Sequence, residues 1–181
     1  MKKHIPNILT MFRFLLVPVF IWLMFFSPVK NHVIWGTLVF IIASITDYFD
    51  GMLARKFNVI SNFGKVMDPL ADKFLVVSAL VALAASPLNL IHPAVVTIII
   101  VREFAVTVMR NHQARKNIFI PANIWGKIKT TVQMVGIIFS LLFVSIFNTP
   151  GVVMSNVLSG YFWLVAVITI LSGVSYFRPV K

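Results

Sequence analysis

The sequence predicts an all-α integral membrane protein with six transmembrane helices and both termini on the cytoplasmic side. Three observations lead to this prediction: hydrophobic residues make up 59% of the 181 positions, charged residues make up only 12%, and the apolar residues form long runs. A run of about 20 apolar residues is long enough to cross the hydrocarbon core of a bilayer. So apolar a chain is typical of a membrane protein and not of a soluble domain.

Six apolar runs cover most of the chain, and each is about as long as one membrane span. No internal repeat, low-complexity tract or linker separates them, so we expect residues 1–181 to form a single domain. The predicted spans cover residues 7–27, 33–54, 68–86, 93–112, 124–147 and 154–176.

The basic residues predict the orientation, because cytoplasmic loops of membrane proteins carry an excess of lysine and arginine. Among the basic residues at the predicted connections, all but Lys30 lie on one side of the membrane. Both termini and the stretch from Asp47 to Asp72 belong to the basic side. The sequence therefore predicts a multi-pass protein of the cell membrane, with these acids at the cytoplasmic face.

The net charge and the absence of cysteine narrow the possible functions. The formal charge is +11, but the basic residues are spread among apolar segments. Membrane phospholipid headgroups or a phosphorylated substrate are therefore the expected anionic partners, and nucleic acid is not. The chain has no cysteine, which excludes disulfides, thiolate metal sites and cysteine nucleophiles.

Four of the five acidic residues fall within one short stretch. Asp47 and Asp50 are three positions apart and Asp68 and Asp72 are four apart, so each pair lies on one face of a helix. We expect the residues between the pairs, including Gly64, to form a short turn that brings the pairs face to face. Four carboxylates so close repel one another unless a cation joins them. Mg²⁺ and Mn²⁺ prefer oxygen ligands, so the sequence predicts a site for one of these ions.

Two other interpretations of these acids stay open. The acids could form a solvated hairpin and pair with nearby basic residues such as Arg55 and Lys73. They could also form a cation-transport site, but such sites lie near the bilayer midplane on broken helices, often within inverted repeats. The position of the acids at one membrane surface and the absence of a repeat argue against transport.

The same stretch resembles the signature of the CDP-alcohol phosphatidyltransferase family. The pattern is D-x-x-D-G-x-x-A-R, eight residues, then G-x-x-x-D-x-x-x-D, and the chain fills every signature position. The matching residues are Asp47, Asp50, Gly51, Ala54, Arg55, Gly64, Asp68 and Asp72. The resemblance implies transfer of a phosphatidyl group from CDP-diacylglycerol, a membrane lipid, to an alcohol, with release of CMP.

The resemblance also implies roles for the acidic residues. Asp47, Asp50 and Asp68 would be metal ligands. Asp72 would be the catalytic base that accepts the proton of the attacking alcohol, and it would also bind a metal ion. The implied cofactor is Mg²⁺ or Mn²⁺.

The CDP group of the lipid would lie against the same two helices. The small residues Gly51, Ala54 and Gly64 would leave room for it, and Arg55 would contact one of its phosphates. The implied CDP-binding residues are Asp47, Asp50, Gly51, Ala54, Arg55, Gly64 and Asp68.

Three further stretches resemble the branch of the family that uses glycerol 3-phosphate as the acceptor alcohol. They are residues 6–10 with Arg13, residues 101–107 with Arg110, and residues 126–130. A dianionic acceptor needs cations in its site. The candidate acceptor-phosphate residues are Thr10, Arg13, Arg102, Arg110, His112 and Lys129. Acceptors that would give cardiolipin or an inositol-phosphate lipid stay open as alternatives.

Two of these basic residues allow more than one interpretation. Arg13 could snorkel to the interface as a topology anchor, or it could face the site. Arg102 lies near the middle of the fourth span, where an unpaired charge is costly, so we expect it to face the protein interior. Because Arg102 and Glu103 are neighbours in sequence, we do not expect them to face each other. Arg102 could instead pair with Glu103 of another chain, since the resemblance implies a homodimer, or with an acid of the 47–72 stretch.

Overall fold

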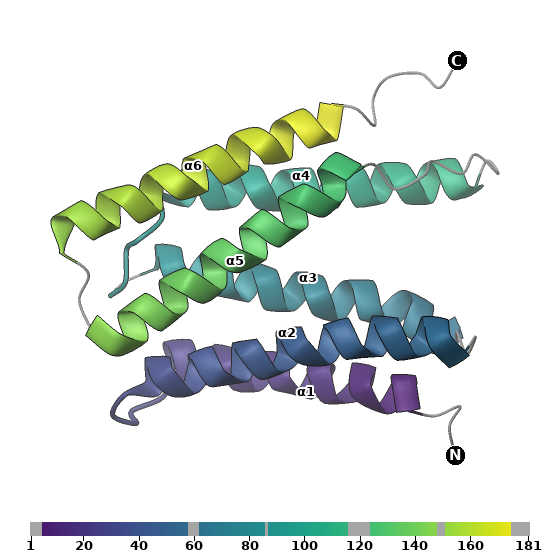
Figure 1. Cartoon of the computed structure of the whole chain (residues 1–181), viewed down its shortest axis with the longest axis horizontal. Coiled ribbons are helices and arrows are strands. Elements are labelled where there is room, and N and C mark those ends of the chain that lie inside the picture. Colours follow the sequence, from purple (N-terminus) through teal and green to yellow (C-terminus); the bar gives the residue numbers. More distant parts are fainter. Residues whose placement is uncertain (1–4, 58–61, 86, 116–123, 148–150, 175–181) are drawn as a thin grey trace. The chain divides into compact units, whose positions relative to one another are not determined.

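Every regular element in the described part of the chain is an α-helix (Figure 1). The structure is a computed structural model, and it describes residues 5–57, 62–85, 87–115, 124–147 and 151–174. Side chains are described for residues 11–47, 70–85, 87–109, 112–113, 126, 128–147 and 151–173. The prediction of an all-α protein is therefore confirmed for this part of the chain.

The described residues form six helices, one for each predicted span. The helices are α1 (Ile5–Phe25), α2 (His32–Phe57), α3 (Asn62–Ala84), α4 (Pro93–Arg115), α5 (Ile124–Phe147) and α6 (Val152–Val174). The largest difference from the prediction is at α3, which begins at Asn62 and not at residue 68. Gly64 is therefore helical, and the prediction that it belongs to a turn is wrong. A glycine costs a helix only about 1 kcal/mol, which the helical residues on both sides offset here.

The connection between α1 and α2 is a tight turn. Asn31 has a positive φ of 63°, a left-handed conformation that asparagine adopts more readily than most residues. The next residue, His32, places its Nδ1 atom 3.0 Å from the carbonyl oxygen of Leu23. Because this carbonyl lies in the last turn of α1, it has no partner within the helix, and the histidine ring satisfies it.

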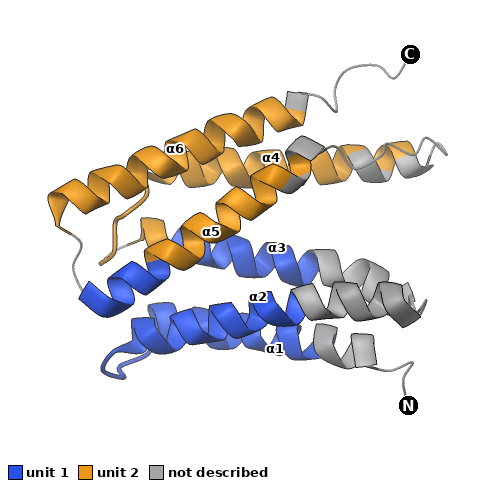
Figure 2. Ribbon diagram, in the orientation of Figure 1, with its two compact units in different colours: residues 1–82, 141–148 blue, residues 83–140, 149–181 orange. Residues whose placement is uncertain are grey.

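The chain forms two compact units (Figure 2). Unit 1 contains residues 1–82 and 141–148, and unit 2 contains residues 83–140 and 149–181. The first part of α5 therefore belongs to unit 2 and its last part belongs to unit 1. Each unit has its own buried side chains.

The interior of unit 1 forms where α1 packs along α2 (Figure 1). Phe20 of α1 and Phe40 of α2 are both fully buried, and their ring centroids are 5.7 Å apart. Thr37 of α2 reaches the end of α5, where its hydroxyl lies 2.8 Å from that of Ser145. Each hydroxyl also lies within hydrogen-bond distance of a carbonyl of its own helix, so burial leaves neither one unsatisfied.

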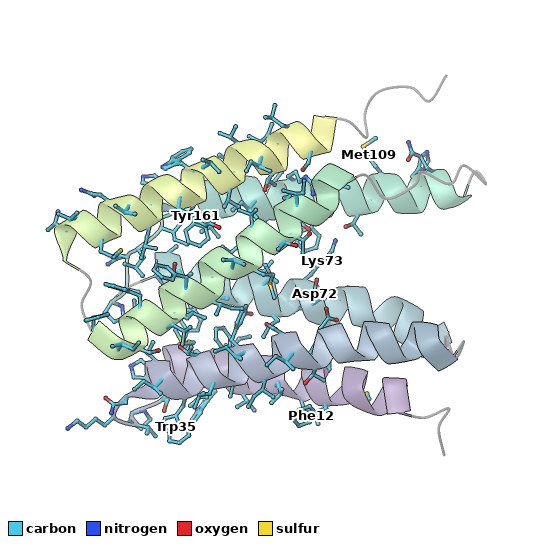
Figure 3. The ribbon with its side chains drawn as sticks, in the orientation of Figure 1. Phe12, Trp35, Asp72, Lys73, Met109 and Tyr161 are labelled. Atoms are coloured by element: carbon cyan, nitrogen blue, oxygen red, sulfur yellow. The ribbon has the colours of Figure 1, made fainter. Side chains whose placement is uncertain are left out.

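In unit 2, Tyr161 of α6 packs against α5 and forms a hydrogen bond with it (Figure 3). The Tyr161 hydroxyl donates a 2.7 Å hydrogen bond to the Val132 carbonyl. Its ring lies directly against Gly136, where an added Cβ would stand 2.3 Å from the ring carbon Cε1. The glycine is thus needed for close approach of the aromatic ring.

Two helices in the described residues are long and apolar enough to cross a membrane. They are Ile128–Phe147 in α5 and Val152–Gly173 in α6. Much of the outer surface of α6 is apolar, with Val153 78% exposed and Leu171 66% exposed. Such a surface is unfavourable in water but matches the hydrocarbon of a bilayer. These two helices are candidate membrane spans, while six spans and their orientation stay predictions.

Candidate active site

The two carboxylate pairs lie on the two helices that flank residues 58–61. Asp47 and Asp50 belong to α2, and Asp68 and Asp72 belong to α3, as their spacing predicts. The two helices run in opposite directions within unit 1 (Figure 1). Their ends are joined by four residues, which can span at most about 18 Å.

The acids stand at matching distances from this connection. Asp47 lies ten residues before Phe57, the end of α2, and Asp72 lies ten residues after Asn62, the start of α3. At 1.5 Å per residue, each is about 15 Å along its helix from the connection. In antiparallel helices, equal distances of this kind put the two acids at the same level.

Asp47 has a basic side chain of α1 as its counter-ion. Arg13 of α1 places its Nη1 atom 2.7 Å from Oδ1 of Asp47. The Arg13 side chain is fully buried, whereas the Asp47 side chain is 45% exposed. A buried guanidinium without an anion beside it would be strongly destabilising, so the pair explains how unit 1 accommodates Arg13.

This contact decides between the two interpretations of Arg13. A snorkelling anchor would extend to the membrane surface and keep its charged end in water. Arg13 instead turns inward, onto the first acid of the signature. The anchor interpretation is therefore wrong, and Arg13 faces the candidate site.

Asp72 lies on α3 with Lys73 as its neighbour (Figure 3). Both side chains are half-buried. A carboxylate in this setting stays accessible to a small polar group, as a catalytic base must be.

Unit 2 holds a second charged group, built from three helices. The Lys129 ammonium of α5 contacts Oε1 of Glu103 on α4. Arg102 Nη1 lies 3.2 Å from the same oxygen, and Arg102 Nη2 donates a 2.7 Å hydrogen bond to the Ser172 hydroxyl of α6. Two cations thus share one carboxylate.

This arrangement corrects one prediction. Arg102 and Glu103 were expected not to face each other because they are adjacent in sequence, yet they form an ion pair within the chain. The arginine side chain is long enough to bend around the helix surface, so the 100° between neighbours does not separate the charged ends. The expectation that Arg102 faces the interior is confirmed, because its side chain is only 13% exposed.

One predicted site residue, His112 of α4, has an exposed side chain. Several others lie in helices, but their side chains lie outside the described part of the structure. The residues without described side chains are Thr10, Asp50, Gly51, Ala54, Arg55, Gly64, Asp68 and Arg110. Their roles stay predictions.

Glu103 contacts two of the predicted site residues but was not itself among them. The sequence does contain a signal for it, because Glu103 is the one acid outside the signature in an otherwise acid-poor chain. Acidic residues within apolar helices are rare and pair with cations or serve function. Ser172 carried no such signal, since serine is common in membrane helices.

The donor chemistry of unit 1 fits a hard divalent cation. Asp47 and Asp72 offer carboxylate oxygens, which Mg²⁺ and Mn²⁺ prefer. Within the set of described side chains, no three acidic or histidine residues gather. The predicted ligand set also includes Asp50 and Asp68 of the same two helices, whose side chains lie outside the described part of the structure.

Comparisons with known proteins agree with the signature. Residues 3–175 match the family described as CDP-alcohol phosphatidyltransferase. A protein of Rickettsia typhi is 34% identical over 179 residues, which cover 99% of this chain and 98% of the relative. A protein of Bacillus subtilis is 38% identical, covering 98% of this chain and 94% of the relative. Both relatives are named CDP-diacylglycerol–glycerol-3-phosphate 3-phosphatidyltransferase.

Proposed function

Because the chain belongs to the CDP-alcohol phosphatidyltransferase family, we propose that it transfers the phosphatidyl group of CDP-diacylglycerol to a hydroxyl of glycerol 3-phosphate. The products are phosphatidylglycerophosphate and CMP. One observation carries the proposal: the complete family signature lies on α2 and α3 with its outer acids at equal distances from their connection. The near full-length similarity to relatives named for this reaction supports the choice of acceptor.

The reaction is a phosphoryl transfer between two oxygen atoms. A hydroxyl oxygen of the acceptor forms a bond to the β-phosphorus of CDP-diacylglycerol. The bond from that phosphorus to the oxygen bridging the two phosphates breaks, and CMP leaves with the electron pair. Asp72 accepts the hydroxyl proton, which makes the acceptor oxygen a better nucleophile.

Members of this family depend on divalent metal ions. In this chain Asp47, Asp50, Asp68 and Asp72 would hold Mg²⁺ or Mn²⁺. When bound, the ions neutralise charge on the diphosphate. Arg13 supports the group from α1, because its ion pair limits the orientations of the Asp47 carboxylate.

The two substrates would meet different sets of residues. The CDP group would lie against Gly51, Ala54 and Gly64, with Arg55 at a phosphate. The acceptor phosphate would bind cations of α4 and α5. The acceptor candidates are Thr10, Arg13, Arg102, Arg110, His112 and Lys129, and among them Arg13 contacts Asp47, a signature acid. We therefore favour a role for Arg13 beside the metal ligands.

The setting of the reaction follows from the lipid substrate. We propose that residues 1–181 form one catalytic domain with six membrane spans, both termini in the cytoplasm and the acids at the cytoplasmic face. This orientation gives a water-soluble acceptor and the lipid access to one site. We further propose that the enzyme is a homodimer.

An acceptor screen tests the proposed function. Purified protein in detergent receives CDP-diacylglycerol, Mg²⁺ or Mn²⁺, and one candidate alcohol, and CMP release is measured. We expect release with glycerol 3-phosphate and little with inositol phosphate or phosphatidylglycerol. Faster release with either of the other alcohols would keep the chemistry but overturn the acceptor.

A further inference from the structure

The charged group of unit 2 centres on a lysine that is almost entirely inside the protein. The Lys129 side chain is 4% exposed, and its ammonium contacts Glu103. A buried ammonium keeps its charge only beside an anion, because desolvation disfavours the charged form. Glu103 supplies an anion at this place.

Arg102, the second cation, is positioned beside the same carboxylate by contacts with α6. Arg102 lies across Gly173, where an added Cβ would stand 3.2 Å from its Nε atom. The Ser172 hydroxyl next to this glycine accepts a hydrogen bond from Arg102 and donates one to the Thr169 carbonyl. The guanidinium is thus held from two sides, by α4 and by α6.

The three charged side chains of this group carry more positive than negative charge. Two cations share one carboxylate, so Arg102, Glu103 and Lys129 together carry a charge of +1. One helical turn beyond Lys129, the Gln133 side chain is 3% exposed, and its Oε1 atom has no hydrogen-bond partner among the described residues. Arg102 and Lys129 are both candidates for the acceptor phosphate, and the buried Gln133 oxygen suits a hydroxyl group of the same small anion.

We propose that Glu103 is a positioning residue for the acceptor: its carboxylate holds Lys129 and Arg102 in the arrangement that binds the phosphate of glycerol 3-phosphate. The inference rests on the proposed function and goes beyond it by assigning a role to Glu103 of α4. Glu103 acts through the two cations and does not touch the acceptor phosphate, which it would repel. Without the carboxylate the two cations lose the anion that they share and repel each other.

The test compares two substitutions of Glu103 in the full-length protein. Glu103→Gln keeps the shape and removes the charge, and Glu103→Asp keeps the charge on a shorter side chain. We expect Glu103→Gln to raise KM for glycerol 3-phosphate by about 10- to 100-fold, the usual effect of losing one charge-assisted contact. KM for CDP-diacylglycerol should change little. Glu103→Asp should recover part of the loss.

A double-mutant cycle shows whether Glu103 acts through Lys129. If it does, adding Glu103→Gln to Lys129→Gln raises KM for glycerol 3-phosphate by a smaller factor than adding it to the wild type, and the remaining effect acts through Arg102. Tyr161→Phe is the matched control, since it removes one part-buried hydrogen bond of the same unit away from the charged group. This control should lower the melting temperature and leave both KM values unchanged.

The outcomes separate this inference from the proposed function. If the wild-type protein releases no CMP with glycerol 3-phosphate, the proposed function is wrong and this inference is wrong with it. If the wild-type protein is active but folded Glu103→Gln has a normal KM for glycerol 3-phosphate, only this inference is wrong. If Glu103→Gln does not fold, Glu103→Asp decides, because an unchanged KM ratio between the two substrates would overturn the inference.

Discussion

The buried guanidinium of Arg13 lies 2.7 Å from the carboxylate of Asp47. The two residues come from different helices, α1 and α2, and Asp47 is the first acid of the family signature. The contact links the N-terminal helix directly to the proposed metal ligands. It explains why a charged residue is kept in the interior of an otherwise apolar helix.

We expect Arg13→Gln to lower kcat at least tenfold while KM for glycerol 3-phosphate stays the same, because Asp47 loses its support and the acceptor loses nothing. Breaking a fully buried ion pair costs about 3–5 kcal/mol, and the cost should be smaller here because the Asp47 side chain is 45% exposed. Arg13→Lys is the control: it keeps the charge but not the planar guanidinium, so its effect should be intermediate. A raised KM for glycerol 3-phosphate with normal kcat would instead assign Arg13 to the acceptor phosphate.

Metal removal tests the role of the four acids. Their mutual repulsion is relieved by a divalent cation, so a chelator should abolish activity and added Mg²⁺ or Mn²⁺ should restore it. CMP release is measured in EDTA and again after each metal is added in excess. Undiminished activity in EDTA would contradict the metal site.

Cysteine labelling tests the predicted orientation, and the chain is suited to it because it contains no cysteine of its own. Lys30 and Pro87 are exposed in the turns after α1 and α3. Cysteines at these positions should react with an impermeant reagent added to intact cells, and a cysteine at Asn58 should not. Asn89, in the same turn as Pro87, is a poorer position for a cysteine because its φ of 45° would strain the new residue. The opposite labelling pattern would reverse the orientation.

The contact between Gly136 and Tyr161 predicts a stability effect without a change in chemistry. Gly136→Ala places a methyl group against the Tyr161 ring, and such overpacking costs about 1–3 kcal/mol. The free energy of unfolding in mixed detergent measures the loss. Gly160→Ala is the control, because nothing lies within 4 Å of its added Cβ. Equal stability of the two variants would mean that Tyr161 does not pack as described.

The number of helices and the helical setting of the acid pairs could be predicted from sequence, because apolar run length and three- or four-residue spacing are local properties. The start of α3 could not, since Gly64 carries a turn signal that the helix overrides. Local spacing also misled at Arg102 and Glu103, where side-chain length and not helix geometry decides the contact.

The pairing of cations with acids depends on how each helix is rotated against its neighbours. Lys129 of α5 contacts Glu103 of α4, although the two residues are 26 positions apart in the sequence. Arg13 meets Asp47 in the same way. The sequence shows that these charged residues lie in apolar helices, where an unpaired charge is unfavourable, but several residues of opposite charge could pair with each of them. Only the packed helices select among them.

Transfer of labelled glycerol 3-phosphate into lipid tests the assigned reaction most directly. Purified wild-type protein and Asp72→Asn are each supplied with CDP-diacylglycerol, Mg²⁺ or Mn²⁺ and glycerol 3-phosphate labelled in its glycerol carbons. We expect the wild type to move label into the organic phase as phosphatidylglycerophosphate, with one CMP released for each label transferred. Asp72→Asn should bind both substrates and transfer none. CMP release without label in the lipid, or equal transfer by Asp72→Asn, would contradict the assigned reaction.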